Sequence, residues 1–389
     1  MSVVAPAGFV ASGLAAGIKA DGSADLALVA TTDGRAVPAA AVFTSNRLAA
    51  APVRVSRAHL SAARSHASAV VLNSGCANAA TGSPGVLAAE RTCETVAHEL
   101  GVVPEQVLVC STGPIGTDLP IDAVVEALPG LVKAAGGTPE HGLFAARAIM
   151  TTDTRPKQVV VRGDGVVVGG MAKGAAMIAP NMATMLAVLT TDAAVPADML
   201  STALSHAVEH TFNRLSLDGC TSTNDTVIAL ASGAGRPVDE GTLSAMLTSA
   251  CAHLAGEMAR DTEGGSKVVR VRVEGAGDDG EALRAARAVA ESSLVKASWA
   301  GEDANWGRVA SELGASGAQF DEARLSISYG PVTVCRGGLA CGHDEAELAA
   351  VLAGPELEVC CELGLGDGTG TILSADLTPS YVELNMGRS

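Results

Sequence analysis

The 389-residue sequence predicts a mixed α/β fold, in which strands and helices alternate along the chain. Three observations lead to this prediction. Hydrophobic residues make up 48% of the chain, which is typical of a globular protein. Short apolar runs of strand length end in polar, glycine-containing turns, and segments with helical spacing lie between them. Aromatic residues are only 2%, so we expect a core of aliphatic side chains.

The first half of the chain shows the strand-then-turn pattern twice. An apolar run over residues 68–72 ends in the turn 73–75, and helical spacing follows around 88–100. A second apolar run over 106–110 ends in Ser111-Thr112-Gly113-Pro114. Backbone N–H groups in such a loop can point outward as anion donors. The alternative is an ordinary strand-to-helix turn with capping residues, which we prefer for 73–75.

The elements that follow have equally local signals. Residues 157–170 predict a hairpin, with Gly163-Asp164-Gly165 as its turn between two valine-rich strands. A strand is predicted over 185–189, and Pro196 opens an amphipathic helix. Residues 364–370 are rich in glycine, but a strand-like segment follows them. They therefore predict a tight turn and not a dinucleotide-binding loop.

Charge excludes several classes of partner. Lys and Arg total 26 against 42 Asp and Glu, which gives a net charge of −16 without a basic cluster. Such a chain is a poor candidate for binding nucleic acid or an anionic membrane. An apolar run of about 18 residues is missing, so we predict no membrane-spanning helix. The N-terminal segment lacks a basic region before its apolar part, which favours a cytoplasmic protein over a secreted one.

The nine cysteines do not form a C-x-x-C pair. A zinc site built from Cys341, His343 and Cys360 is the alternative, but this spacing fits no structural zinc site. We expect buried, reduced thiols and no metal.

Thr184 stands between Pro180-Asn181-Met182-Ala183 and the predicted strand 185–189. A buried strand explains the residues after Thr184 but not those before it. A threonine hydroxyl becomes a useful nucleophile when the α-amine of the same residue acts as its base, because that amine has a pKa of about 7.7–8.0. This requires a chain break between Ala183 and Thr184, made by attack of the hydroxyl on the Ala183 carbonyl and opening of the ester by water. The alternative is that Thr184 only packs.

Motifs spread over nearly the whole chain are similar to those of the ornithine acetyltransferases (glutamate N-acetyltransferases, the ArgJ family). The segment Lys173-Gly174 … Met177-Ile178-x-Pro180-x-Met182-Ala183-Thr184-Met185-Leu186 resembles the self-cleavage segment of that family. The other motifs follow in the order of the family: Phe43-Thr44-x-Asn46 … Ala51-Pro52-Val53, Asn73-Ser74-Gly75-x-Ala77-Asn78-Ala79, Ser111-Thr112-Gly113-x-Ile115-Gly116, Met150-Thr151-Thr152-Asp153-Thr154-x-Pro156-Lys157, Phe212-Asn213 … Asp218-Gly219-x-Thr221-Ser222-Thr223-Asn224-Asp225-Thr226 and Gly301-x-Asp303-x-Asn305-Trp306-Gly307-Arg308.

The resemblance implies an ArgJ/DmpA-like fold with a nucleophile made by autoproteolysis. Cleavage between Ala183 and Thr184 would give an α chain of residues 1–183 and a β chain of residues 184–389. Thr184 would be the nucleophile, and Thr112 and Gly113 would form the oxyanion hole, which agrees with the outward N–H groups expected in that loop. The resemblance also implies these substrate-binding residues: Thr151, Lys173, Thr184, Glu263, Asn385 and Ser389.

The implied substrates are amino acids, so a cation for a carboxylate and a carboxylate for an ammonium make physical sense. From charge alone, however, Lys173 and Glu263 would be solvated surface residues, and Thr151 would make a local turn bond. The C-terminal tail departs from the family pattern. It reads Asn385-Met386-Gly387-Arg388-Ser389, one residue short and without the usual tyrosine, with Ser389 in place of the terminal hydroxyl residue.

The implied reaction is ping-pong transfer of an acetyl group from N-acetylornithine to glutamate, without a cofactor, in an assembly of two α and two β chains. Some family members also accept acetyl-CoA, and the sequence leaves this open. It also does not separate a primary arginine enzyme from a paralogue of a secondary pathway. One alternative keeps the nucleophile but uses water as acceptor: a self-processing aminopeptidase or amidohydrolase. The motifs at 150–157 and 305–308 favour acetyl transfer. Another alternative is a non-catalytic binding protein of the same fold.

Overall fold

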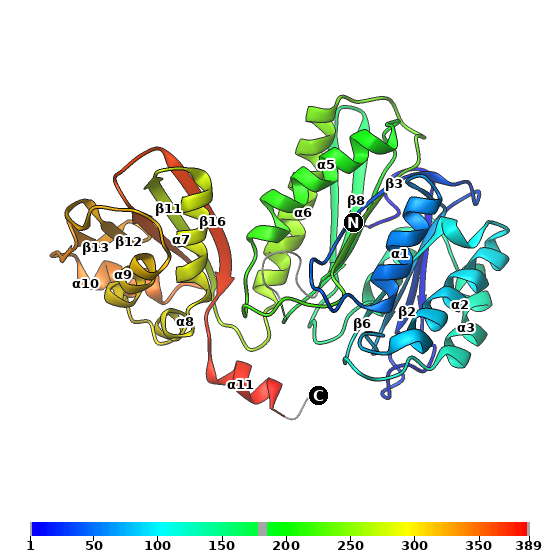
Figure 1. Cartoon of the computed structure of the whole chain (residues 1–389), viewed down its shortest axis with the longest axis horizontal. Helices are drawn as coiled ribbons and strands as arrows, with labels where there is room; N and C mark the ends of the chain where they lie inside the picture. The colour runs from blue at the N-terminus through cyan, green and yellow to red at the C-terminus, as the bar shows by residue number, and fades with distance from the viewer. Residues whose placement is uncertain (1, 178–184, 387–389) are drawn as a thin grey trace. The chain divides into compact units, whose positions relative to one another are not determined.

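The computed structural model describes residues 2–177 and 185–386, and it confirms the mixed α/β class (Figure 1). The chain forms two compact units. The N-terminal unit contains Met1–Asn213 and Cys220–Met258, and the C-terminal unit contains Arg214–Gly219 and Ala259–Ser389. Within the described ranges, no helix is long and apolar enough to cross a membrane.

The N-terminal unit contains a four-stranded sheet. Its strand order is β1 (Phe9–Leu14), β2 (Leu26–Thr31), β5 (Ala69–Ser74) and β6 (Val107–Thr112). Strands β5 and β6 are the two predicted apolar runs, and they pair in parallel with Ser74 opposite Thr112. The loops that follow these strands therefore leave the same edge of the sheet.

A six-stranded sheet completes the framework of this unit. Its order is β4 (His66–Ala67), β3 (Val37–Phe43), β10 (Thr226–Ala231), β9 (Leu186–Thr191), β8 (Val166–Lys173) and β7 (Lys157–Gly163). The predicted hairpin is β7 and β8, and the predicted strand 185–189 is β9. Every residue of β9 and β10 is buried, because both strands lie in the interior of the sheet.

Side chains from both sheets pack into one core, which joins Val29 and Leu72 with Met171, Val188 and Ile228. The helices of this unit are α1 (Ala51–Ala62), α2 (Gly82–Leu100), α3 (Ile121–Lys133), α4 (Pro139–Ala148), α5 (Ala197–His210) and α6 (Glu240–Arg260, whose last two residues belong to the C-terminal unit). Figure 1 shows α2 and α3 on one side of this framework and α5 and α6 on the other. The second face of the four-stranded sheet packs on α2 and α3 through Val96 and Leu128.

The C-terminal unit has a six-stranded sheet of its own. Its order is β14 (Leu339–Ala340), β13 (Val332–Arg336), β12 (Ser326–Tyr329), β15 (Glu356–Glu362), β11 (Val268–Ala276) and β16 (Gly368–Ala375). Alternate residues of β11 are buried against α7 (Asp279–Glu291), as expected for a sheet with one covered face. The remaining helices are α8 (Ser293–Ala300), α9 (Trp306–Ala315), α10 (Glu345–Leu352) and α11 (Pro379–Asn385).

Most predicted elements are confirmed, with shifted ends. Helix α2 begins at Gly82, six residues before the first residue of the predicted helical spacing. Helix α5 follows Pro196 as predicted and ends at His210, before a short 3-10 helix, Phe212–Arg214. The glycine-rich segment 364–370 joins β15 to β16, with β16 already begun at Gly368.

Candidate active site

The loop that leaves β6 is shaped by one glycine. Gly113 has φ of +139°, and a Cβ at this position would lie 2.5 Å from the backbone nitrogen of Cys76. Only glycine can adopt this φ and also let the main chain at residue 113 approach the main chain of Gly75 and Cys76 so closely. Cys76 N donates to the carbonyl oxygen of Thr112 at 3.1 Å, which fixes the loop from the other side.

Lys173, at the end of β8, joins two other predicted site residues. Its Nζ atom donates to Oγ1 of Thr151 at 2.6 Å and to Oγ1 of Thr112 at 3.1 Å. The residue is 3% exposed, so the interpretation as a solvated surface charge is wrong. An ammonium group is only a donor, so both hydroxyl oxygens accept here and keep their own hydrogens for another acceptor.

Asp153 lies next to this cluster and was given no function by the sequence. Its Oδ1 atom accepts from Lys157 Nζ at 2.6 Å and from Gly174 N at 2.8 Å, and its Oδ2 accepts from Thr151 N at 3.1 Å. The Asp153 and Lys157 side chains are both fully buried. The local turn bond expected near Thr151 is present, but it uses the backbone nitrogen, while the hydroxyl accepts from Lys173.

Electrostatics keep Asp153 ionised. Burial by itself raises the pKa of this carboxyl group, but the ammonium groups of Lys173 and Lys157 and the hydrogen bonds outweigh it and hold the pKa below its usual value. The signal in the sequence was an acid four residues before a lysine, inside the motif at 150–157. Nothing in that spacing indicated that both side chains are buried.

Asn224 and Asp225 lie directly before β10, and their side chains bind the main chain at Ser111 and at Met185. The Asn224 side-chain amide donates to Ala77 O at 2.6 Å and to Ser111 O at 2.8 Å. Asp225 Oδ1 accepts from Met185 N at 2.9 Å. Burial raises the pKa of Asp225 well above its usual value, although the Met185 N–H and the charge of Lys173 act against this.

Two predicted binding residues lie in the C-terminal unit and contact each other. Asn385, in α11, donates through Nδ2 to Glu263 Oε2 at 3.0 Å. Glu263 is 8% exposed, so it too is not a solvated surface charge. The structure thus brings together Thr112, Thr151 and Lys173 in one unit, and Glu263 and Asn385 in the other.

Comparison with known proteins identifies the family. The sequence model of the ArgJ family matches residues 10–387. The chain belongs to the ArgJ family. The resemblance stated from the motifs is therefore confirmed over nearly the full length.

Curated relatives match from end to end. The arginine biosynthesis bifunctional protein ArgJ of Bifidobacterium longum is 45% identical over 392 residues, with 99% of each chain covered. The protein of the same name from Thermobifida fusca is 44% identical over 390 residues, with 100% of each chain covered.

Solved structures match in part. Ornithine acetyltransferase from Mycobacterium tuberculosis, complexed with ornithine, is 45% identical with a TM-score of 0.44 and covers 46% of this chain and 94% of its own. The ArgJ protein of Bacillus halodurans is 37% identical with a TM-score of 0.49 and covers 51% of this chain and 96% of its own.

Ala183, Thr184 and Ser389 lie outside the residues that the structure describes. The predicted nucleophile, the cleavage point and the division into chains 1–183 and 184–389 of this ArgJ-family chain therefore stay predictions. The two compact units do not bear on the cleavage, since residues on both sides of Ala183/Thr184 belong to the N-terminal unit.

The cysteines are partly as expected. Six of them are buried outside disulfides: Cys76, Cys93, Cys110, Cys251, Cys335 and Cys361. Cys220, however, is exposed, and Cys341 and Cys360 are half-buried. Cys220 and Cys341 lie in loops, and Cys360 is on the face of β15 opposite the buried Val359 and Cys361. In ranges 2–177 and 185–386, no group of three or more His, Cys, Asp or Glu side chains is arranged to hold a metal.

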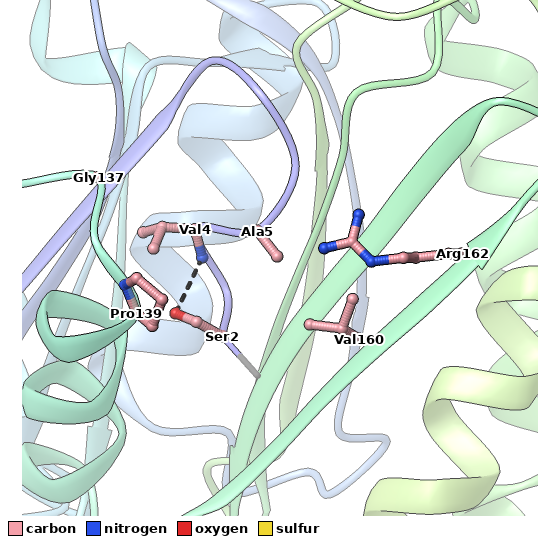
Figure 2. A pocket seen from close by; sticks show the side chains of 7 residues that line it. All are labelled: Ser2, Val4, Ala5, Gly137, Pro139, Val160 and Arg162. Atoms are coloured by element: carbon pink, nitrogen blue, oxygen red, sulfur yellow. Dashed lines mark hydrogen bonds between the residues drawn. The ribbon is translucent and has the colours of Figure 1, made fainter.

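The N-terminal unit has a surface cavity of about 530 Å³ (Figure 2). Figure 2 shows Val160 and Arg162 of β7 on one side of it and the N-terminal segment on the other. Its lining is Ser2, Val4, Ala5, Gly137, Pro139, Val160 and Arg162. None of these is a predicted site residue, so this cavity is not the site that the motifs indicate.

Proposed function

We propose that this chain is an ornithine acetyltransferase of arginine biosynthesis, which transfers the acetyl group of N2-acetylornithine to glutamate. Full-length relatives at 44–45% identity bear the name arginine biosynthesis bifunctional protein ArgJ. The structural observation that carries the proposal is the buried ammonium group of Lys173 on the hydroxyl oxygens of Thr112 and Thr151. It combines a positive charge with two oriented hydroxyl groups, as recognition of an amino-acid substrate and stabilisation of an oxyanion require.

The proposed reaction has two halves on Thr184. The threonine hydroxyl attacks the acetyl carbonyl of N-acetylornithine, and its proton passes to the α-amine of the same residue. The carbonyl oxygen becomes an oxyanion, which the Thr112 hydroxyl and the Gly113 N–H stabilise. The C–N bond then breaks, the ornithine amine takes the proton, and an acetyl ester remains on Thr184. In the second half, the glutamate amine attacks the ester carbonyl, and the bond from that carbon to the threonine oxygen breaks. The proton lost by the amine passes through the Thr184 α-amine to the threonine oxygen, which releases N-acetylglutamate and regenerates the hydroxyl.

Substrate recognition in this proposal uses opposite charges. Lys173 binds a substrate carboxylate, and Thr151, which Lys173 holds at 2.6 Å, adds a hydroxyl group. Glu263, oriented by Asn385, binds an ammonium group. Ser389 completes the set as the terminal hydroxyl residue.

Processing and assembly belong to the same proposal. Self-cleavage makes chains 1–183 and 184–389, which assemble as two α and two β chains. A cytoplasmic location is supported by the six buried cysteines that form no disulfide. No cofactor enters the reaction. Acetyl-CoA as a second acetyl donor is to be tested in the same assay.

The deciding experiment is the intact mass of the purified protein under denaturing conditions. We expect two fragments that meet at Ala183/Thr184 for the wild type, and one full-length chain for Thr184→Ala. Thr95→Ala, which changes a threonine on the surface of α2, serves as the matched control and should cleave normally. A single wild-type chain that still transfers acetyl groups would overturn the α-amine as base.

Acetyl transfer is then measured with N-acetylornithine and glutamate, and with acetyl-CoA in a parallel reaction. We expect N-acetylglutamate to form at the rate at which ornithine is released. Ornithine release that is independent of glutamate would identify water as the acceptor and favour the aminopeptidase or amidohydrolase alternative. A cleaved or uncleaved chain without turnover would favour the binding protein.

A further inference from the structure

Two adjacent buried residues connect the C-terminal end of β6 to the start of β9. We propose that Asn224 and Asp225 are positioning residues, which hold the oxyanion loop (residues 111–113, the last two residues of β6 and the glycine after them) in fixed register against the strand that follows the nucleophile. The inference rests on the proposed function, because it concerns the same reaction. It assigns a purpose to the motif 221–226, which that reaction does not use.

Asn224 holds the loop side. Its Nδ2 atom carries two hydrogens, and both are donated to main-chain oxygens, those of Ala77 and Ser111. Its Oδ1 atom accepts from Thr223 Oγ1 at 2.6 Å. A flipped amide would turn its oxygen toward two carbonyl oxygens, so the network allows a single orientation. Asn224 therefore fixes the main chain one residue before Thr112.

Asp225 holds the strand side. Its side chain is fully buried, and Oδ1 accepts from Met185 N at 2.9 Å. Its own main-chain oxygen accepts from Thr44 N at 2.9 Å, which continues the pairing of β10 with β3. Oδ2 has no hydrogen-bond partner among the described residues. Asp225 thus lies directly before β10 and holds Met185, the residue that follows Thr184 in the sequence.

The two contacts are made by the side chains of neighbouring residues, Asn224 and Asp225, so a movement of this segment shifts Ser111 and Met185 together. Residues 226 and 186 are directly paired in the parallel ladder of β10 and β9, which adds a second connection on the strand side. Oxyanion donors contribute only when they lie within about 2.7–3.1 Å of the charge that develops, and a displacement of about 1 Å can cost about 100-fold in rate. The adjacent residues Asn224 and Asp225 hold the oxyanion loop and the strand after the nucleophile, and so keep the oxyanion donors and the nucleophile at a fixed distance.

A merely structural function of Asn224 would also lower stability when removed, so the control must lose comparable bonds on the same strand. Ser56 provides it. Its buried hydroxyl donates to Val109 O and accepts from Val109 N, both at 2.7 Å, two residues before Ser111 in β6. Ser56→Ala removes two buried hydrogen bonds to β6 without touching the loop.

The experiment compares Asn224→Ala, Thr223→Val and Ser56→Ala with the wild type. For each, kcat and KM for acetyl transfer are measured per cleaved molecule, together with the thermal midpoint. We expect Asn224→Ala to lower kcat at least about 10-fold with KM changed less than about 3-fold, because the oxyanion exists only in the transition state. Ser56→Ala should lower the midpoint similarly and leave kcat within about twofold.

Thr223→Val keeps the shape of the side chain and removes only the bond that orients the Asn224 amide. If Asn224→Ala fails to fold, Thr223→Val provides the test of the proposal. Its kcat should fall about 3-fold or more. On the strand side, Asp225→Asn keeps an acceptor for Met185 N and should cleave like the wild type. Asp225→Ala removes that acceptor and should slow the appearance of the two fragments at least about 10-fold.

The inference is overturned if Asn224→Ala and Thr223→Val keep wild-type kcat, or if Ser56→Ala loses as much kcat as Asn224→Ala. Asp225→Ala that cleaves at the wild-type rate would remove the strand-side half. These results presuppose an active wild type. A wild-type chain that neither cleaves nor transfers acetyl groups would instead overturn the proposed function itself.

Discussion

The Nζ atom of Lys173 lies 3.1 Å from Oγ1 of Thr112, so the predicted substrate-binding lysine contacts the predicted oxyanion-hole threonine directly. The ammonium hydrogen occupies an acceptor site of the hydroxyl, which directs the hydroxyl hydrogen toward another acceptor. The positive charge also makes that hydroxyl a stronger donor to a developing oxyanion. Lys173 is thus placed to serve binding and catalysis together.

Lys173→Met should therefore affect both kinetic constants. Loss of the charge behind Thr112 should lower kcat about 10- to 1000-fold, and loss of a carboxylate partner should raise KM. Steady-state kinetics of acetyl transfer measure both. Lys133→Met, at the exposed end of α3, is the control for removal of a lysine. A rise in KM with unchanged kcat would show that Lys173 acts in binding alone.

Gly113→Ala should abolish acetyl transfer. The added Cβ would lie 2.5 Å from Cys76 N and 2.6 Å from Gly75 C, both backbone atoms that cannot move aside cheaply. Gly116→Ala is a demanding control, because this residue of the same loop also has a positive φ, of +83°, but open space around it. We expect Gly116→Ala to lower the thermal midpoint and keep measurable activity. Equal activity of the two variants would contradict the close approach at Gly113.

Asp153→Asn should destabilise the N-terminal unit. It leaves the ammonium group of Lys157 buried without its carboxylate, at a cost of about 3–5 kcal/mol. The double variant Asp153→Asn/Lys157→Met removes both charges and should regain much of the loss. Urea unfolding followed by circular dichroism in the uncleaved Thr184→Ala background makes the comparison on one continuous chain. A double variant less stable than the single one would argue against this explanation.

The same carboxyl group has a defined dependence on pH. Because its native pKa lies below the unfolded one, its contribution to stability is present above the unfolded pKa and is lost as pH falls through the native value. The thermal midpoint of the wild type should therefore fall in acid more steeply than that of the double variant.

Asp225→Asn should have the opposite dependence. The native pKa of Asp225 is raised, so the folded protein retains a proton that the unfolded chain releases above about pH 4. Its contribution to stability decreases as pH rises from that point to the native pKa. Asparagine has no such proton, so the midpoint of the variant should gain on that of the wild type between about pH 4 and pH 7. A difference that does not change with pH would mean that Asp225 is ionised in the native state.

Glu263→Gln should separate charge from geometry in the C-terminal unit. Glutamine keeps an oxygen that can accept from Asn385 Nδ2, as Glu263 does at 3.0 Å, but it carries no charge. We expect KM for N-acetylornithine to rise about 10-fold, since an ammonium group loses its counter-charge, with a smaller change in kcat. Unchanged KM would assign Glu263 to the support of α11.

The sequence predicted the elements whose signals are local. The apolar runs that became β5 and β6 end within two residues of the predicted positions, and the hairpin β7–β8 follows its glycine turn. Helix α2 begins earlier than predicted because its first turn, Gly82-Ser83-Pro84, carries no apolar periodicity. The pairing of β3 with β10 joins segments far apart in sequence, which no local pattern indicates.

The candidate site divides in the same way. Motif resemblance supplied Thr112, Thr151 and Lys173, and the structure brings them into contact. Charge alone suggested that Lys173 is a surface residue, because composition does not show that the end of β8 is buried. Asn224 went without a function since its partners, Ala77 and Ser111, are 147 and 113 residues away along the chain. Their hydrogen bonds exist only once the two sheets have packed.

The order of strands in the six-stranded sheet has a consequence for the cleaved molecule. Its two central strands, β10 and β9, come from beyond residue 184, while β3 on one flank and β8 on the other come from before it. A nick at Ala183/Thr184 would sever a covalent link and leave both hydrogen-bonded seams intact. Strands of the β chain would lie between strands of the α chain in one sheet, so dilution would not separate the two chains. The sheet would have to be assembled before the nick is made.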